Sequence, residues 1–459
     1  MRFIIRLASV AWSNTPLMKT KMLFATLLTL VLVTAGYAQT LDKAKLDQLF
    51  DRLLEKNKGM GSLTLAKDGN VLYTRSFGYG QINGTEKKPL TATTKYRIGS
   101  ITKTYTAVMI FQLVEEGKLS FTDTLDKFFP QIPNAAKITI RQILNHRSGI
   151  HNLEPDGSWG KQPRTKDEVV ARIAQGQPDF EPDARHLYSN TGYVLLGYIV
   201  EKAGGKPYQE ALKERITSRI GLKDTYLGAG NTDPGKNEAL SYSYVGGWRE
   251  AAEIDFSITG GAGAILSTPA DMTKFIQALF DLKLVSQNSL NQMKTMRDGE
   301  GMGMEPFSFA GKTLYGHTGG SNSSGAWLAY FPEEKLALAY TTNAKIYTVS
   351  NIVSGVFDIY WNRPFQIPTF DTFDVSTEVL DRYVGVYTIP GTPAKMTVTR
   401  DGATLYIQAG AEPSRGVPLE ATAEDKFKID PGVVFEFDAA KGQLTIKRPN
   451  GERVFTKEK

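Results

Sequence analysis

The sequence predicts an α+β protein in which an antiparallel sheet, flanked by helices, carries a helical lobe and is followed by a small all-β, barrel-like domain. Alternating apolar runs typical of strands occur near 62–77 and again beyond 312, and apolar runs with helical spacing lie between them. From Leu380 on, short alternating runs are separated by turn pairs such as Asp401-Gly402. With 41% hydrophobic and 22% charged residues, the 459-residue chain can bury two or three cores.

Residues 1–38 are predicted to be a signal segment. Two lysines precede an apolar stretch over 22–33 that is short for a membrane span, and Gly36 and Ala38 are the small residues that a signal peptidase reads. Met18 is a second candidate for the start of translation. The chain has no cysteine to carry a lipid anchor, so we expect an exported protein of the bacterial periplasm without a membrane span.

The remaining composition excludes several kinds of chemistry. The signal segment holds four basic residues and no acid, so its removal lowers the net charge from +6 to +2, and no basic run predicts nucleic-acid binding. The absence of cysteine excludes disulfides and thiol catalysis. The four histidines lack metal-ligand spacing, so neither a metal nor another cofactor is predicted.

The elements are predicted in chain order. Leucines at three- and four-residue steps predict an amphipathic helix over 40–58, and a Lys67-Asp68-Gly69-Asn70 turn predicts a hairpin over 62–77. The segment 118–250 is expected to be rich in helices and loops. A further helix is predicted to begin at Thr268-Pro269, with threonine as N-cap and proline at the first position.

The pattern changes near Arg363-Pro364, where a domain boundary is predicted. The resulting units are 39–366 and 372–459. The alternating runs of the second unit predict an antiparallel barrel.

Three short segments far apart in the sequence carry groups suited to serine acyl transfer. The first runs from Ser100 to Lys103, follows Gly99 and opens an apolar run that predicts a buried helix. Ser100 and Lys103 then share one face of its first turn, where the helix dipole favours a developing anion. The same S-x-x-K pattern at Ser158 lies among prolines and glycines in a predicted loop and is not favoured.

Lys103 has two interpretations. The ordinary one is a solvated lysine at a frayed helix start. The functional one is a buried lysine whose pKa is lowered, so that it accepts the proton of Ser100.

Tyr188-Ser189-Asn190 is the second segment and lies before an apolar run over 192–200, at a predicted loop-to-helix junction. A packed aromatic and an N-cap asparagine are the structural alternatives. In a catalytic interpretation, the Tyr188 hydroxyl relays a proton and the Asn190 amide positions substrate. Tyr360-Trp361-Asn362 repeats the pattern, so the pattern alone is not specific.

The third segment, His317-Thr318-Gly319-Gly320, lies in a run of predicted antiparallel strands. A lone strand histidine is usually a hydrogen-bonded structural residue. The two glycines, however, would let a substrate lie along the strand edge and bond to backbone N–H groups.

Over roughly residues 45 to 365, the order and surroundings of these segments resemble the serine β-lactamase and penicillin-binding-protein superfamily, above all its class C β-lactamase and D,D-peptidase (S12-type) branch. The resemblance implies the fold of that superfamily. It also implies roles for the matching residues: Ser100 as acylated nucleophile, Lys103 and Tyr188 as the proton-transfer pair, the N–H groups of Ser100 and Gly320 as oxyanion hole, and Asn190, His317, Thr318 and Gly319 as substrate-binding residues.

Two departures modify what the resemblance implies. In most β-lactamases of this branch the strand motif begins with lysine, whereas His317 is largely neutral at pH 7, which favours a peptidase or an esterase. Pro182-Asp183 stands where relatives commonly place Pro-Gly, so a local change of turn is expected. The C-terminal unit resembles the lipocalin-like tails of some hydrolases of this superfamily, and substrate selection by that unit is a hypothesis.

The sequence therefore predicts an exported serine hydrolase that works through a Ser100 acyl-enzyme. Its substrates are expected to be small peptides, amides or esters, peptidoglycan-derived ones included, with a D,D-carboxypeptidase, D-aminopeptidase or esterase activity. Two alternatives stay open: a class C-like β-lactamase, and a penicillin- or peptide-binding sensor that does not turn over.

Overall fold

The computed structural model describes residues 41–153, 159–244, 246–321, 323–370, 373–409, 416–429, 433–448 and 451–458. The predicted signal segment and Ser158 lie outside these ranges. None of the helices within them is both long enough and apolar enough to cross a membrane.

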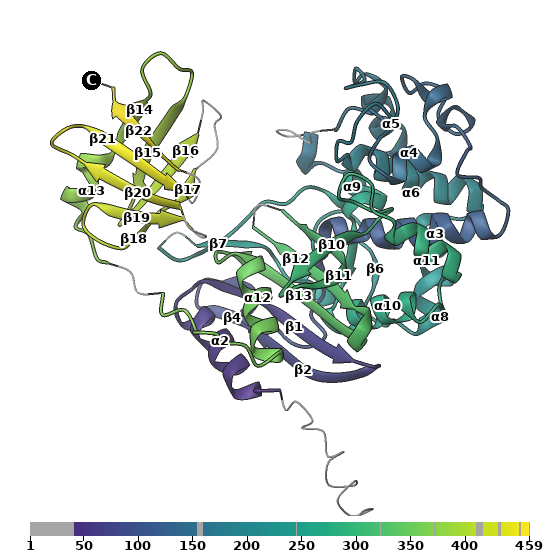
Figure 1. Cartoon of the computed structure of the whole chain (residues 1–459), viewed down its shortest axis with the longest axis horizontal. Coiled ribbons are helices and arrows are strands. Elements are labelled where there is room, and N and C mark those ends of the chain that lie inside the picture. Colours follow the sequence, from purple (N-terminus) through teal and green to yellow (C-terminus); the bar gives the residue numbers. More distant parts are fainter. Residues whose placement is uncertain are drawn as a thin grey trace, which may run out of the picture.

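A six-stranded antiparallel sheet forms the centre of the first unit, with the strand order β10-β11-β12-β13-β1-β2 (Figure 1). Its strands are β1 (Gly59–Lys67), β2 (Asn70–Phe77), β10 (Glu305–Phe309), β11 (Lys312–Gly320), β12 (Gly325–Phe331) and β13 (Leu336–Lys345). The register between β1 and β13 begins with Gly59 opposite Lys345. The first hairpin of the chain is therefore an integral part of a sheet whose other strands come much later.

Helices cover both faces of this sheet, and the main ones are α2 (Lys43–Glu55), α3 (Thr102–Glu115), α10 (Pro269–Phe280) and α12 (Val349–Tyr360). Side chains of β13 alternate between the faces. Leu338 packs in the apolar cluster that contains α2 and α12, whereas Ala337 and Ala339 pack in the cluster that contains α3 and α10. The small alanines leave room for helices on the second face, which is the face that carries the helical lobe.

The lobe consists of helices around α3, which is buried from Thr102 to Leu113 and so forms the centre of this part of the molecule (Figure 1). Its helices are α4 (Ile140–Leu144), α5 (Lys166–Ala174), α6 (Asn190–Gly204), α7 (Tyr208–Leu212), α8 (Ser218–Ile220), α9 (Phe256–Gly263) and α11 (Gln287–Lys294). The remaining elements of the first unit are minor strands and single turns: β3 (Tyr79–Asn83), β4 (Glu86–Pro89), β5 (Tyr96–Arg97), β6 (Tyr226–Leu227), β7 (Tyr242–Tyr244), β8 (Trp248–Glu250), β9 (Ile265–Ser267), the π-helical turn η5 (Lys213–Thr217) and the 3-10 turns η1 (Gly99–Ile101), η2 (Leu125–Lys127), η3 (Ala135–Lys137), η4 (Trp159–Lys161), η6 (Pro234–Lys236) and η7 (Pro332–Glu334).

The C-terminal unit is one helix and a nine-stranded antiparallel sheet of order β17-β16-β15-β14-β22-β21-β20-β19-β18. Its elements are α13 (Thr377–Tyr383), β14 (Gly385–Thr388), β15 (Lys395–Asp401), β16 (Thr404–Ala409), β17 (Val417–Pro418), β18 (Glu420–Ala421), β19 (Lys426–Ile429), β20 (Val433–Asp438), β21 (Gln443–Arg448) and β22 (Gly451–Lys457). Only Leu419 separates the two edge strands in the chain, so the sheet is a nearly closed barrel. The predicted fold class is thus confirmed for both units.

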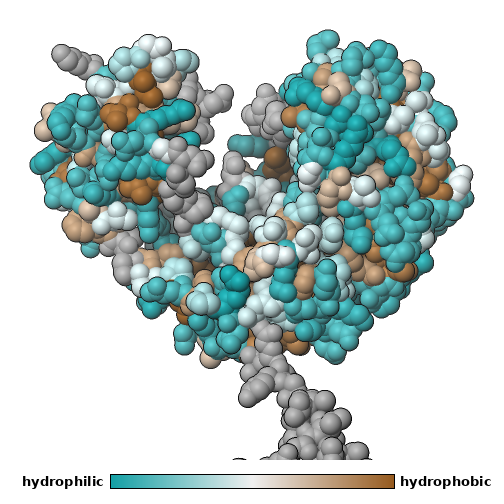
Figure 2. Space-filling view, in the orientation of Figure 1, coloured by the Kyte–Doolittle hydropathy of each residue, from teal (hydrophilic) through white to brown (hydrophobic). Residues whose placement is uncertain are grey.

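The two units touch near the β7–β8 hairpin (Figure 1). Lys58 of the first unit forms an ion pair with Glu420 of the second, and Arg249 lies 3.8 Å from Asp401. Figure 2 shows the surface hollowed between the C-terminal unit and the helical lobe. The predicted boundaries at 366 and 372 fall between the last helix of the first unit and α13, and they stay a prediction.

Candidate active site

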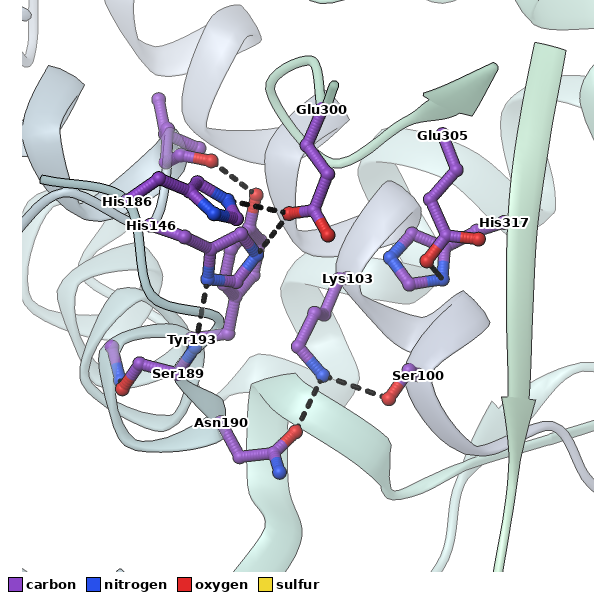
Figure 3. A network of polar contacts seen from close by, with 12 residues as sticks. Ser100, Lys103, His146, His186, Ser189, Asn190, Tyr193, Glu300, Glu305 and His317 are labelled. Carbon is purple, nitrogen blue, oxygen red and sulfur yellow. Dashed lines mark hydrogen bonds and ion pairs between the residues drawn. The ribbon is translucent and has the colours of Figure 1, made fainter. Parts of the chain in front are cut away.

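Ser100 and Lys103 lie on consecutive turns, Ser100 in η1 and Lys103 at the start of α3. The Lys103 Nζ lies 2.9 Å from Ser100 Oγ, 2.8 Å from Asn190 Oδ1 and 3.1 Å from the carbonyl oxygen of Ala262 (Figure 3). The Lys103 side chain is fully buried. The alternative of a solvated lysine is therefore wrong.

Burial lowers the pKa of Lys103 to about 7, although the carboxylates of Glu305 and Glu300 act in the opposite direction. A large share of the molecules then holds a neutral amine near pH 7. Such an amine can donate its two hydrogens to Asn190 and to the carbonyl of Ala262 and still accept the hydroxyl hydrogen of Ser100. The geometry thus suits Lys103 to activate Ser100.

Tyr188 approaches the same serine from the lobe. Its ring lies 4.8 Å from the Lys103 Nζ, and the Ser100 side chain is near enough to its hydroxyl to act to lower the pKa of the phenol. The ring also stacks on the imidazole of His146, with 4.4 Å between centroids. Burial raises the pKa of Tyr188. The phenol therefore holds its proton at neutral pH and can donate it.

Helix α6 positions the two residues that follow Tyr188. Ser189 is the N-cap, since its hydroxyl accepts from the Gly192 N–H at 3.2 Å, and Asn190 is the first helical residue. The N-cap alternative for Asn190 is therefore wrong by one residue. The cap leaves the Asn190 side chain available to bind Lys103.

The turn before Tyr188 contains an aspartate with left-handed backbone. Asp183 has a φ of +69°, a conformation that aspartate tolerates better than most residues. Arg147 Nε donates to Asp183 Oδ1 at 2.7 Å, and the Asp183 N–H donates to the Arg147 carbonyl at 2.8 Å. The change of turn expected at Pro182-Asp183 thus takes the form of an aspartate held by Arg147.

The end of β11 lies directly against the turn that carries Ser100. A Cβ on Gly319 would lie 2.0 Å from the Ile98 carbonyl oxygen and 2.9 Å from the Ser100 nitrogen. A Cβ on Gly99, whose φ is +52°, would lie 2.4 Å from the Gly320 nitrogen. Only glycines permit this approach, which brings the N–H groups of Ser100 and Gly320 to one place, as an oxyanion hole requires.

His317, the first residue of the His317-Thr318-Gly319-Gly320 segment, is buried. The His317 side chain is 3% exposed, and its Nδ1–H donates to the Thr318 carbonyl at 2.6 Å. Burial lowers the pKa of His317, although the nearby Glu305 acts to raise it. The imidazole is therefore neutral at pH 7 and provides no fixed positive charge.

Two further histidines and a carboxylate, which have no role in the sequence-based site, support Tyr188. His146 Nδ1 accepts from the Ser189 N–H at 3.0 Å, so its proton is on Nε2, which lies 3.7 Å from Glu300 Oε2. The same oxygen is 3.1 Å from His186 Nε2 (Figure 3). Glu300 thus fixes the imidazole on which Tyr188 stacks.

Glu305 is the second carboxylate without a predicted role. Its Oε2 accepts hydrogen bonds from both the N–H and the hydroxyl of Thr318, each at 3.1 Å, and its Oε1 lies 3.6 Å from His317 Nδ1. Both acids belong to the short segment Glu300-Gly301-Met302-Gly303-Met304-Glu305. A short segment with two glycines is typical of a loop, so the sequence offered no signal for either acid.

A pocket of about 220 Å³ opens beside Ser100. Its wall combines apolar side chains of the lobe with two charged ones, Arg97 and Glu253. Glu253 accepts from the Ser321 hydroxyl at 2.8 Å, and Arg97 donates to the Ile254 carbonyl at 2.7 Å. The lining residues are Arg97, Gly99, Ser100, Leu153, Asn190, Thr191, Val194, Glu253, Ile254, Ile258, Thr259, Ala262, Gly263, Gly320, Ser321 and Ser324.

The second Y-x-N segment lies elsewhere. Tyr360 ends α12, and its hydroxyl donates to Glu334 at 3.0 Å. Within the described ranges, no group of three or more histidine, aspartate or glutamate side chains is placed to hold a metal ion.

Known proteins are similar to this chain in sequence and in fold. Residues 46–352 match the family model described as Beta-lactamase. The chain is 29% identical to penicillin-binding protein 4* of Bacillus subtilis over 404 residues, 80% of this chain and 87% of that protein. It is 23% identical over 392 residues to the D-alanyl-D-alanine-carboxypeptidase/endopeptidase AmpH of Escherichia coli, 76% of this chain and 100% of that protein.

A solved structure agrees with these sequence relatives. The D-amino acid amidase of Ochrobactrum anthropi, complexed with D-phenylalanine, aligns with a TM-score of 0.63 and 28% identity over 70% of this chain and 99% of its own. The predicted resemblance is thereby confirmed. The chain belongs to the Beta-lactamase family and is a serine hydrolase of the β-lactamase and penicillin-binding-protein superfamily.

Proposed function

We propose that this chain is an exported enzyme that hydrolyses D-amino-acid amides, peptides or esters through an acyl-enzyme at Ser100. The observation that carries the proposal is the 2.9 Å contact between Ser100 Oγ and the buried Nζ of Lys103. The similarity to a D-amino acid amidase and to the carboxypeptidase AmpH supports the substrate class.

Acylation begins with proton transfer from Ser100 to the neutral amine of Lys103. Ser100 Oγ then bonds to the substrate carbonyl carbon, and the N–H groups of Ser100 and Gly320 stabilise the oxyanion. The leaving nitrogen or oxygen takes the proton of the Tyr188 hydroxyl as its bond to carbon breaks. Tyr188 recovers a proton from Lys103, so the proton of Ser100 ends on the leaving group.

Deacylation repeats these transfers with water. A water molecule gives a proton to Lys103, directly or through Tyr188, and its oxygen bonds to the acyl carbon. The ester bond to Ser100 Oγ then breaks, and Oγ takes the proton back. The raised pKa of Tyr188 supports this cycle, because the phenol returns to its protonated form after each step.

The neutral His317 supports a peptidase or esterase over a dedicated β-lactamase. A β-lactam presents a carboxylate to the strand edge, where a lysine would bind it with a full charge. Burial favours the uncharged imidazole of His317 instead. We therefore expect slow turnover of β-lactams relative to D-amino-acid amides.

One substrate panel tests the proposal. Wild type and Ser100→Ala are assayed with D-amino-acid amides, D-Ala-D-Ala peptides, aryl esters and a chromogenic cephalosporin, and mass spectrometry detects an adduct on Ser100. We expect turnover of an amide or peptide that is abolished in Ser100→Ala. Turnover that survives the substitution refutes the mechanism, and an adduct without turnover indicates the sensor instead.

Export is tested separately. Expression of the full chain in a Gram-negative host, followed by fractionation and N-terminal sequencing, should yield a periplasmic protein that begins at Gln39. A product in the cytoplasm with an intact N-terminus would contradict export and leave the proposed chemistry unchanged.

A further inference from the structure

The edge of β11 next to Ser100 binds a carboxylate that belongs to the chain itself. The pairing of β10 with β11 ends where Glu305 lies opposite Gly316. Beyond that point, the Glu305 side chain reaches along β11 and accepts two hydrogen bonds from Thr318, one from the N–H and one from the hydroxyl, both at 3.1 Å. A backbone N–H and a hydroxyl that converge on one carboxylate oxygen form a small anion site.

This anion site lies beside the reacting centre. Gly320, which supplies a proposed oxyanion N–H, is two residues along the same strand from Thr318, a distance of about 6.6 Å in extended chain. One amino-acid residue of a substrate spans about 3.8 Å between α-carbons, and a hydrogen bond adds about 2.9 Å. A carboxylate one residue away from the scissile carbonyl can therefore reach the donors of Thr318.

The pocket defines which half of the substrate faces this site. The pocket beside Ser100 is lined by Gly320, Ser321 and Ser324, at the end of β11 that lies away from Glu305. An acyl group whose side chain fills the pocket directs its leaving group along β11, from Gly320 toward Thr318.

We propose that Glu305 occupies a carboxylate-binding position for the leaving group and thereby makes the enzyme select leaving groups that carry no carboxylate. This inference rests on the proposed function and assigns the leaving-group class of the same site. A substrate carboxylate would have to displace Glu305 or lie beside it, where two like charges repel. A carboxamide or an ammonium group, in contrast, can donate a hydrogen bond to Glu305.

Glu305 also acts on Lys103 and His317, and the test has to separate this effect. The Glu305 carboxylate raises the pKa of Lys103. Its removal would change the fraction of neutral Lys103 and with it the rate for every substrate. This change affects both substrates equally. It therefore cancels in the ratio of the kcat/KM values for two substrates that differ only in one carboxylate.

The experiment compares N-acetyl-D-Ala-D-Ala with its C-terminal amide, in wild type and in Glu305→Gln. Glutamine keeps an acceptor for Thr318 and removes the charge. We expect wild type to prefer the amide in kcat/KM, and Glu305→Gln to raise the acid-to-amide ratio by about 10- to 100-fold. Glu333→Gln, at an exposed glutamate in the turn before β13, is the matched control and should leave the ratio unchanged.

Two outcomes overturn the inference in distinguishable ways. An unchanged ratio in a Glu305→Gln enzyme that still hydrolyses the amide refutes the role of Glu305 alone. If wild type neither turns over nor acylates with either peptide but hydrolyses another substrate of the panel, the inference fails and the proposed function stands; inactivity across the whole panel removes both.

A second measurement uses only the wild type, in case the variant does not fold. D-alaninamide and D-alanine, the two leaving groups, are compared as acceptors of the acyl group on Ser100, and mass spectrometry measures the peptide formed by aminolysis, so that hydrolysis of D-alaninamide itself does not enter the result. We expect the amide to be acylated at lower concentration than the free acid. Equal or more efficient acylation of D-alanine would overturn the proposal.

Discussion

The candidate active site has two sides that differ in how their polar groups are used. On the helix side, the buried Nζ of Lys103 hydrogen-bonds with Ser100, Asn190 and a backbone carbonyl, so the proposed base is held against the reacting serine. On the strand side, the donors of Thr318 are already taken by Glu305. The difference indicates that the helix side determines the reaction and the strand side determines which substrate enters it.

The largest expected effect lies on the helix side. Lys103→Met keeps an apolar chain of similar length and removes the base, so kcat/KM should fall by about 10²- to 10⁴-fold while the protein stays folded. Steady-state kinetics and thermal unfolding measure the two quantities. Lys118→Met, at an exposed lysine, is the control, and a comparable loss there would contradict a specific role for Lys103.

A smaller effect is expected where the two sides meet. Gly319→Ala places a methyl group 2.0 Å from the Ile98 carbonyl oxygen, so β11 has to move away from Ser100. We expect a loss of about 10²-fold in kcat, because a shift of about 1 Å misplaces the oxyanion donors. Gly247→Ala, where a Cβ meets nothing within 4 Å, should retain activity. Full activity of Gly319→Ala would exclude the proposed oxyanion hole.

The pH dependence of kcat/KM tests whether a neighbouring carboxylate raises the pKa of Lys103. Neutral Lys103 is the active form, so kcat/KM should rise with pH through a midpoint near the Lys103 pKa of about 7. Glu300 raises this pKa, and Glu300→Gln should therefore move the midpoint to lower pH, by less than about one unit. Glu333→Gln is again the control. A midpoint that moves to higher pH would contradict the assignment of the limb to Lys103.

The smallest effect is expected from the C-terminal unit. It has its own apolar core, so deletion of 371–459 should leave a folded body that still acylates Ser100. If the unit selects substrates at the hollow between it and the lobe, preference between short and long peptides changes by a few-fold. Glu420→Gln breaks the ion pair with Lys58. It is the control that weakens the contact between the two units without removing the C-terminal unit. Unchanged preference in a stable truncated enzyme removes the hypothesis.

The parts of the site that could be predicted share a local signal. Ser100 and Lys103 lie at the start of an apolar helix, and Gly319 and Gly320 mark a strand that approaches another backbone. Both the helix start and the glycine pair can be recognised from neighbouring residues in the sequence. The cap of α6 was misplaced by one residue because Ser189 and Asn190 are equally good N-cap residues.

Other residues could not be predicted because their partners are remote in sequence. Glu300 binds His186 and His146, which lie more than a hundred residues earlier, and nothing near Glu300 marks it as buried. In the C-terminal unit, α13 is a short helix and β17 and β18 have two residues each, too few for a periodic pattern. Tertiary contacts, not local preferences, fix these elements.

The order of strands in the central sheet has a consequence for how the protein is made. The strand β1 pairs with β13 along its whole length, and Gly59 lies opposite Lys345. The central sheet therefore cannot form completely before the chain has been synthesised as far as residue 345. Contacts between such distant residues slow folding, because a long loop has to close first. We expect a chain emerging from the ribosome to stay open until most of it has been synthesised, a state in which a translocation channel could still accept it.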